Sequence, residues 1–148
     1  MTSTNYAAEH FKAKERFVEH ALSECSPVSL LDVGCNTRHF SLMAARAGAR
    51  VVFIDYGPAV VNEVWRRACG ERLNILPLVV NLTRPTPSVG WRNREFASFL
   101  DRARGSFEAV LMLAVMHHML VTERIPLDEI LSQARTIRTA GFYLLRKR

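Results

Sequence analysis

The sequence has few cysteines and no long apolar run. Cys25, Cys35 and Cys69 lie far apart and form no CxxC pair, which argues against a zinc site and favours free thiols in a reducing compartment. No apolar stretch approaches the length of a membrane-spanning helix, and the N-terminal segment has no apolar signal core. Internal repeats and low-complexity tracts are also absent. These absences predict a cytoplasmic globular protein with no metal site and no membrane partner.

What remains is the composition of one ordinary domain. The chain has 148 residues, of which 49% are hydrophobic and 23% are charged, enough to bury a core in a single domain that spans residues 1–148. The net charge is +6, and five arginines face only two acids between Arg84 and Arg104. We expect this stretch to be solvated surface. Nucleic acid is the less favoured partner, because we find no interleaving of these arginines with aromatics as in single-strand binders.

Hydrophobic periodicity predicts strands that alternate with helices. The expected helices cover residues 6–24, 38–47 (stopped by Gly48), a segment from Pro58 to a cap at Gly70, 94–103, and a segment that begins at Pro126. The expected strands cover residues 30–33, 50–55, 73–80, 107–115 and 142–145, with Pro77 placing the third at an edge. This order predicts an α/β fold: a doubly wound, Rossmann-like, mostly parallel sheet of about five strands with helices on both faces.

The most informative stretch is LLDVGCNTRHFSLMAARAGARVVFID, residues 30–55. A short strand that contains Asp32 leads into a turn at Gly34, and the next strand ends on Asp55, 21 positions after that glycine. Strand, turn, helix and strand with a terminal acid is the layout of a nucleotide-binding crossover. In this layout the helix N-terminus faces the ligand, and the strand-end carboxylate accepts hydrogen bonds from ribose hydroxyls.

Together with His117-His118 after the fourth strand, these residues resemble class I S-adenosylmethionine-dependent methyltransferases. A nicotinamide-binding fold fits less well, because its GxGxxG pattern meets Gly34, Asn36 and His39 here. The resemblance implies an N-terminal helix (1–26), a cofactor-binding half (27–82) and a second half (83–148). That second half ends before the C-terminal hairpin of the full family fold. The stretch 84–101 is also similar to bacterial methyltransferase-like proteins, including nodulation-associated ones.

The same resemblance assigns site residues and implies S-adenosylmethionine as the cofactor. Cofactor contacts are expected at the first turn for the methionine end, after the second strand for the ribose, and after the third strand for the adenine; these residues are Asp32, Gly34, Cys35, Asn36, Asp55, Tyr56, Asn81 and Leu82. His117 is the expected base on the substrate side. The alternatives are ordinary turn, cap and packing roles for these residues.

Three departures from the family pattern leave other functions open. Arg38 replaces a glycine beneath the cofactor and obstructs it, swings outward or pairs with its carboxylate. Asn81 replaces an acid that contacts adenine, and the absent hairpin leaves the strand at 142–145 as a free edge through which a homodimer could form. We therefore predict methyl transfer to a small molecule. The alternatives are an impaired relative or interaction module, and an RNA methyltransferase. Trp91 and Phe96 are expected in the core, or else in a substrate lid.

Overall fold

A computed structural model describes residues 3–34, 38–113, 115–139 and 144–145. It contains one parallel sheet in the order β3-β2-β1-β4-β5. The strands are β1 (Ser29–Val33), β2 (Arg50–Asp55), β3 (Ile75–Val79), β4 (Ala109–Leu111) and β5 (Leu144–Leu145). The predicted doubly wound α/β fold is confirmed, because the strand order reverses direction at β1 and all pairs are parallel.

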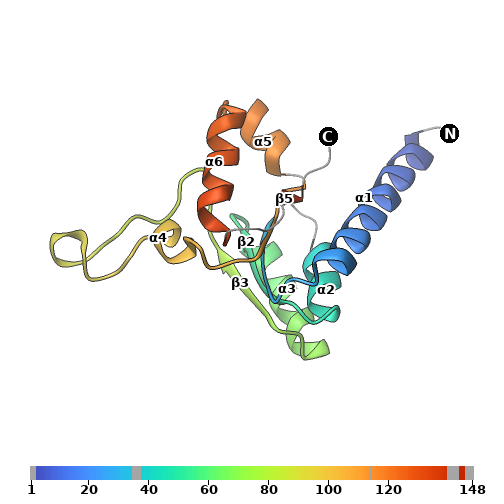
Figure 1. Ribbon diagram of the computed structural model, residues 1–148, viewed down its shortest axis with the longest axis horizontal. Coiled ribbons are helices and arrows are strands. Elements are labelled where there is room, and N and C mark those ends of the chain that lie inside the picture. The colour runs from blue at the N-terminus through green and yellow to red at the C-terminus, as the bar shows by residue number, and fades with distance from the viewer. Residues whose placement is uncertain (1–2, 35–37, 114, 140–143, 146–148) are drawn as a thin grey trace.

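Helices cover both faces of the sheet (Figure 1). One face packs against α1 (Ser3–Cys25), α2 (His39–Arg46) and α3 (Pro58–Glu71), and the other against α4 (Phe99–Ala103), α5 (Val115–Val121) and α6 (Leu127–Ile137). The alternation of side chains along each strand decides which face a residue joins. In β1, for example, Leu30 packs with α1 and α2, whereas Leu31 and Val33 pack with α5 and α6.

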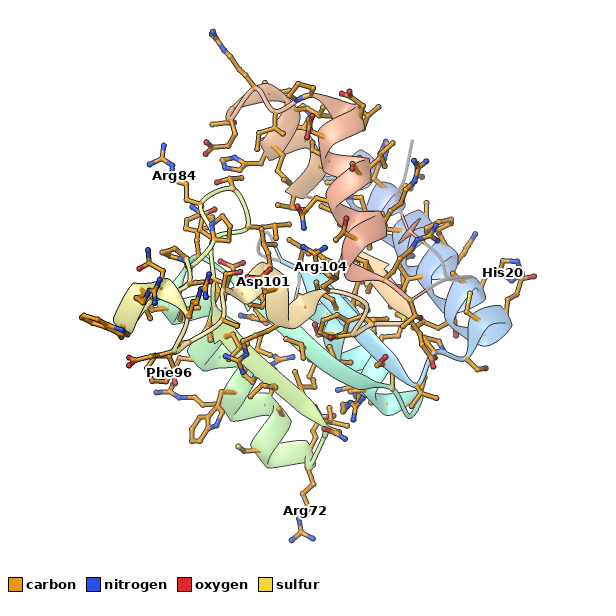
Figure 2. The ribbon with its side chains drawn as sticks, turned by 60° about the vertical axis from the view of Figure 1, so that its left-hand side comes forward. His20, Arg72, Arg84, Phe96, Asp101 and Arg104 are labelled. Carbon is orange, nitrogen blue, oxygen red and sulfur yellow. The ribbon has the colours of Figure 1, made fainter. Side chains whose placement is uncertain are left out.

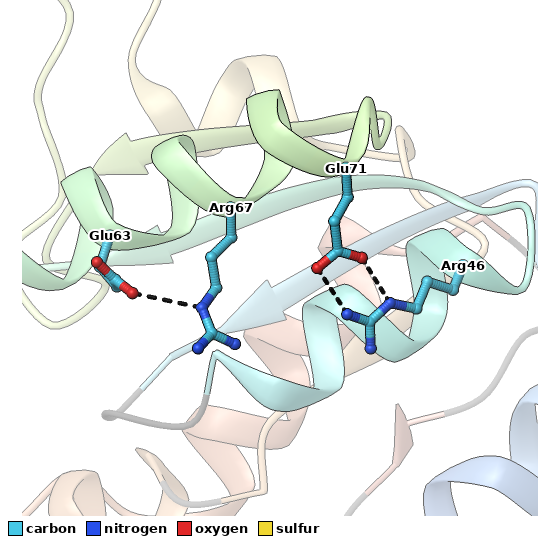
Figure 3. Close-up of polar contacts among 4 residues, drawn as sticks. All are labelled: Arg46, Glu63, Arg67 and Glu71. Carbon is cyan, nitrogen blue, oxygen red and sulfur yellow. Dashed lines mark hydrogen bonds and ion pairs between the residues drawn. The ribbon is translucent and has the colours of Figure 1, made fainter.

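An ion pair joins the two helices that follow β1 and β2. The Arg46 guanidinium of α2 donates two hydrogen bonds to the Glu71 carboxylate of α3, at 2.8 and 2.7 Å (Figure 3). Arg67 and Glu63 pair along α3, at 3.3 Å. The bidentate geometry makes the pair of Arg46 with Glu71 the more specific of the two. Both pairs are partly exposed, so each contributes less than about 1 kcal/mol.

Two glycines predicted to end helices behave differently. Gly48 adopts φ +99° just after α2, as expected for a helix terminus. Gly70, however, lies inside α3, and Arg72 adopts the left-handed conformation that caps this helix. The predicted cap at Gly70 is therefore wrong. The helix continues because a glycine interrupts it only weakly, and the Leu73 N–H then closes the end by donating to the Ala68 carbonyl at 2.8 Å.

The second half departs most from the sequence prediction. The helix predicted over 94–103 is shortened to α4, which Ser98 caps by accepting the Asp101 N–H at 3.0 Å. The strand predicted over 107–115 is shortened to β4, because Val115 already begins α5. The strand error comes from reading a run of apolar residues as one continuous element, although a loop residue such as Met112 can be equally buried. The helix error has another source, because residues 94–97 are exposed and belong to the loop before the Ser98 cap.

The edges of the sheet agree in part with expectation. Pro77 lies in β3, which pairs only with β2 among the described strands, so the predicted edge position is confirmed. Residues 142–143 of the predicted last strand lie outside the described residues, and dimer formation through this edge stays a prediction. No helix in the described part of the chain is both long and apolar enough to span a bilayer.

Candidate functional site

A pocket opens at the carboxyl ends of β1, β2 and β3, below α5. It is lined by Val33, Gly34, Ile54, Asp55, Tyr56, Val80, Asn81, Leu82, Thr83, Val115 and His118. In open α/β sheets this edge, near the reversal of strand order, is where ligands bind. Five of the eight predicted cofactor residues line the pocket: Gly34, Asp55, Tyr56, Asn81 and Leu82.

Asp55 ends β2 and faces the Gly34 turn. Its side chain is only 5% exposed, and its Oδ1 atom accepts the Gly57 N–H at 2.8 Å. Its Oδ2 atom lies 3.0 Å from the point where a Cβ on Gly34 would stand. The register of β1 and β2, in which Val33 lies opposite Ile54, brings the two residues together. A carboxylate held in this way can accept further hydrogen bonds from ligand hydroxyls.

Gly34 is needed here because space is short. A Cβ at this position would lie 2.7 Å from two ring carbons of Phe53, a side chain that is fully buried. The Gly34 N–H also donates to the Ile54 carbonyl at 2.8 Å, which fixes the turn against β2. The glycine therefore permits the Phe53 ring and the Asp55 carboxylate to approach the backbone of the turn closely.

Asp32 is buried behind the pocket and is not part of its described lining. The Ser41 hydroxyl of α2 donates to its Oδ2 atom at 2.6 Å. The pKa of Asp32 is raised to about 7, chiefly by burial; the nearby Asp55 charge adds to this rise and the Ser41 hydrogen bond opposes it. The bond ties the first turn of α2 to β1, so the structure gives Asp32 a positioning role. Contact with the methionine end of a cofactor stays a prediction.

Tyr56 and His118 form the aromatic part of the pocket wall. Their ring centroids lie 6.5 Å apart and their planes differ by 18°, although Tyr56 follows β2 and His118 belongs to α5. The Nε2 atom of His118 also lies 3.4 Å from a carboxylate oxygen of Glu123. A histidine oriented by a carboxylate is a common arrangement for proton transfer.

The neighbouring His117 is exposed and does not line the pocket. Consecutive residues of a helix point about 100° apart, so only one of the two histidines can face the ligand. The sequence pattern favoured His117 because it comes first after the fourth strand. The geometry favours His118, and a catalytic role for either residue stays a prediction.

Asn81 lies at the pocket rim, where its side chain closes a local turn. Its Oδ1 atom accepts the Thr83 N–H at 3.0 Å and the Thr83 hydroxyl at 2.7 Å. These two bonds occupy the carbonyl oxygen that was expected to accept the adenine amino group, so such a contact would require the turn to open. The amide N–H group remains suited to donate to a ring nitrogen.

Arg38 does not enter the pocket. The residue precedes α2, its side chain is exposed, and it is not among the described lining residues. The predicted obstruction of the cofactor by Arg38 thus has no support in this arrangement. Cys35 and Asn36, the other two predicted residues of the turn, lie outside the described residues. Across the described ranges, no group of three His, Cys, Asp or Glu side chains could hold a metal ion.

Sequence reasoning missed Thr83, Glu123 and Val115 as residues of this region. The turn formed by Asn81 and Thr83 has a local signal, since asparagine two positions before threonine favours such a turn. Glu123 has no comparable signal, because it lies five positions after His118 and beyond the end of α5, outside the spacing of three or four at which side chains of a helix meet.

Comparison with known proteins extends over most of the chain. A sequence model described as a methyltransferase domain matches residues 4–144. Among curated proteins, nodulation protein NoeA of Rhizobium meliloti (strain 1021) is 31% identical over 140 residues. These residues cover 94% of this chain but 29% of NoeA, so the chain spans less than a third of that relative's length.

Solved structures share the fold at low sequence identity. The N-methyltransferase NodS from Bradyrhizobium japonicum WM9 has a TM-score of 0.64 at 14% identity, over 99% of this chain and 70% of NodS. TehB from Haemophilus influenzae has a TM-score of 0.63 at 20% identity, over 87% of this chain and 38% of TehB. At these identities the likeness establishes the fold alone.

Proposed function

The chain belongs to the methyltransferase domain family, and from this premise we propose that it binds S-adenosylmethionine in the Asp55 pocket and methylates a small-molecule acceptor. The observation that carries the proposal is the buried Asp55 carboxylate facing the Gly34 turn. The neighbouring pocket, which is lined by Val110, Met112 and Met119 among others, contains no carboxylate among its described residues.

The pocket residues fit an adenosyl group. The Asp55 carboxylate supplies acceptors for two ribose hydroxyls, and Gly34 lets this carboxylate lie directly against the turn because it adds no side chain between them. Tyr56 and Leu82 supply an aromatic and an apolar surface suited to a purine ring. Asp55 would therefore hold the ribose, and Tyr56 with Leu82 the base.

When bound, this cofactor supplies an activated methyl group on a sulfonium centre. The protein then has two tasks, to orient the acceptor in line with the methyl group and to exclude water. A hydroxyl or ammonium acceptor must also lose a proton. His118, held by Glu123 on the α5 side of the pocket, is placed to take that proton.

The first prediction tests cofactor binding. Calorimetric titration with S-adenosylhomocysteine should give a saturable signal for the unaltered chain, and Asp55→Asn should weaken binding about 10- to 100-fold, because each hydrogen bond to a charged acceptor contributes about 1.5–3 kcal/mol. Asparagine can still accept the Gly57 N–H, so the turn is retained. Asp128→Asn, at an exposed aspartate of α6, is the matched control and should bind normally.

An absent signal for the unaltered chain would overturn the proposal. It would favour the alternative of an inactive relative that retains the fold. Binding by the unaltered chain that Asp55→Asn leaves intact would instead remove the ribose role of this carboxylate.

The second prediction separates the two histidines. With an amine or hydroxyl acceptor that is methylated, His118→Gln should lower the rate of S-adenosylhomocysteine formation about 100-fold, the usual contribution of a general base. His117→Gln is the matched control on the exposed side of α5 and should retain the rate. Equal loss in both variants would indicate that α5 was disturbed, and loss in His117→Gln alone would restore the assignment made from the sequence.

A further inference from the structure

Between β3 and α4, residues 84–99 form an arm that projects from the body of the domain (Figure 1). Val89 and Phe96 face each other as an antiparallel bridge and exchange two backbone hydrogen bonds, at 3.0 and 3.1 Å. Closer to the body, the Phe99 N–H donates to the Thr86 carbonyl at 3.2 Å. The Ser98 N–H donates to the Ser88 hydroxyl at 3.1 Å. The arm is therefore an ordered hairpin, whose two sides are joined by hydrogen bonds from its tip to its base.

The tip of the arm has a set backbone conformation. Gly90 adopts φ +89°, and a Cβ at this position would overlap the Glu95 side chain. Arg92 and Asn93 follow with φ values of 57° and 55°. A turn built from left-handed residues and a required glycine presents its side chains in one arrangement before any partner arrives.

Apolar side chains of the arm lie in solvent. Trp91 is 77% exposed, Phe96 66% and Val89 45%. The prediction that Trp91 and Phe96 pack in the core is therefore wrong. They are exposed because the bridge between Val89 and Phe96 carries this segment away from the sheet. Grouped apolar side chains on a soluble domain mark a surface that contacts something apolar.

The same arm also carries exposed cations. Arg84, Arg92 and Arg94 are exposed, and within the described ranges no ion pair includes them. Figure 2 shows Arg84 and Phe96 on the side of the molecule that carries the arm. The one acid on the arm is Glu95. The arm thus combines an apolar tip with net positive charge.

We propose that the arm is a peripheral membrane-contact site, whose Trp91, Phe96 and Val89 enter the interface of an anionic lipid surface. Tryptophan favours the headgroup region of a bilayer, and arginines beside it can pair with lipid phosphates while their stems cover apolar surface. The contact is independent of methyl transfer. It departs from the sequence prediction of no membrane partner, because that prediction rested on the lack of a spanning run and a peripheral contact requires none.

Single-stranded nucleic acid is the less favoured ligand of this arm. Such ligands follow a basic groove with successive stacking platforms, whereas here two aromatics and a valine gather near one turn. Valine offers a base no stacking surface but adds to the apolar area that a bilayer can bury. A projecting tip also suits a flat surface.

Tryptophan fluorescence tests the proposal directly. The chain has two tryptophans, so Trp65→Phe leaves Trp91 as the single reporter at the arm tip. Vesicles that contain phosphatidylglycerol should shift its emission to shorter wavelength and protect it from acrylamide, whereas vesicles of phosphatidylcholine alone should bind more than about tenfold less protein. Circular dichroism should be unchanged by the substitution.

Two charge-matched variants make the test specific to the arm. Arg92→Gln with Arg94→Gln should reduce vesicle binding at least about tenfold, and Phe96→Ser should abolish the emission shift. Arg66→Gln with Arg135→Gln removes the same charge from exposed positions on α3 and α6 and should retain binding. Unchanged Trp91 emission with anionic vesicles would overturn the proposal. So would equal loss in both arginine pairs, or an emission shift with a short single-stranded RNA but not with vesicles.

Discussion

Gly34→Ala should lower both stability and affinity for S-adenosylhomocysteine. The added methyl group would lie 2.7 Å from the Phe53 ring and 3.0 Å from the Asp55 carboxylate. Phe53 is fully buried between β2 and α3 and cannot move without disturbing the core. Overpacking of this kind costs about 1–3 kcal/mol. Because Asp55 must also shift, cofactor affinity should fall more than about tenfold.

Gly70→Ala is the matched control, because a Cβ there meets nothing within 4 Å. The residue lies inside α3, so alanine should stabilise the protein by up to about 1 kcal/mol and leave binding unchanged. Urea unfolding and calorimetry measure the two effects on both variants. If Gly34→Ala were as stable as the unaltered chain and bound equally well, the close packing of the Phe53 ring and the Asp55 carboxylate against Gly34 would be refuted.

Asp32→Asn should change how stability depends on pH. Burial raises the pKa of Asp32 in the folded protein to about 7 from an ordinary value of 3.8, so the folded state holds its proton where the unfolded state has lost it. This carboxyl group therefore contributes full stability below about pH 4, and the contribution is lost as pH rises towards 7. At about 1.4 kcal/mol for each pKa unit, the loss has an upper limit of about 4 kcal/mol.

Asparagine cannot ionise, yet its carbonyl can still accept the Ser41 hydroxyl. The free energy of unfolding of Asp32→Asn should therefore fall less steeply between pH 4 and pH 7 than that of the unaltered chain. Urea unfolding at several pH values measures this slope. If the amide N–H group of the new asparagine lacked a partner, the free energy of unfolding would fall by the same amount at every pH. The slope of the free energy of unfolding against pH is therefore the quantity that tests the prediction. Asp128→Asn should retain the original slope, and an unchanged slope in Asp32→Asn would contradict the burial of a protonated carboxyl group.

The first half of the chain could be predicted more fully than the second. The strand predicted over 50–55 matches β2 residue for residue, and the helix predicted from Pro58 begins there, because a buried strand and a proline at a helix start have strong local signals. Between Leu82 and Val115 the prediction failed for α4, for the length of β4 and for the aromatics of the arm. There the outcome depends on long-range pairing and on which apolar residues find a partner, and neither leaves a local pattern.

The site residues also differ in how far the sequence predicted them. The pairing of Gly34 with Asp55 followed from sequence, because parallel strands joined by a helix bring their carboxyl ends to one edge. The choice of His118 over His117 did not, because it depends on where α5 begins and how it rotates against the sheet. The contact from Glu123 depends in turn on the path of the chain after α5.

The amino-acid sequence alone determined the doubly wound sheet, its family and the acidic end of β2, since these follow from the order of strands and helices and from short motifs. Tertiary packing decided that Asp32 holds α2 against β1, that Arg38 is exposed and outside the described pocket lining, and that the arm projects into solvent. The physical reason is that burial is a property of the folded whole. A side chain's charge, pKa and accessibility follow from neighbours that lie far from it in the sequence.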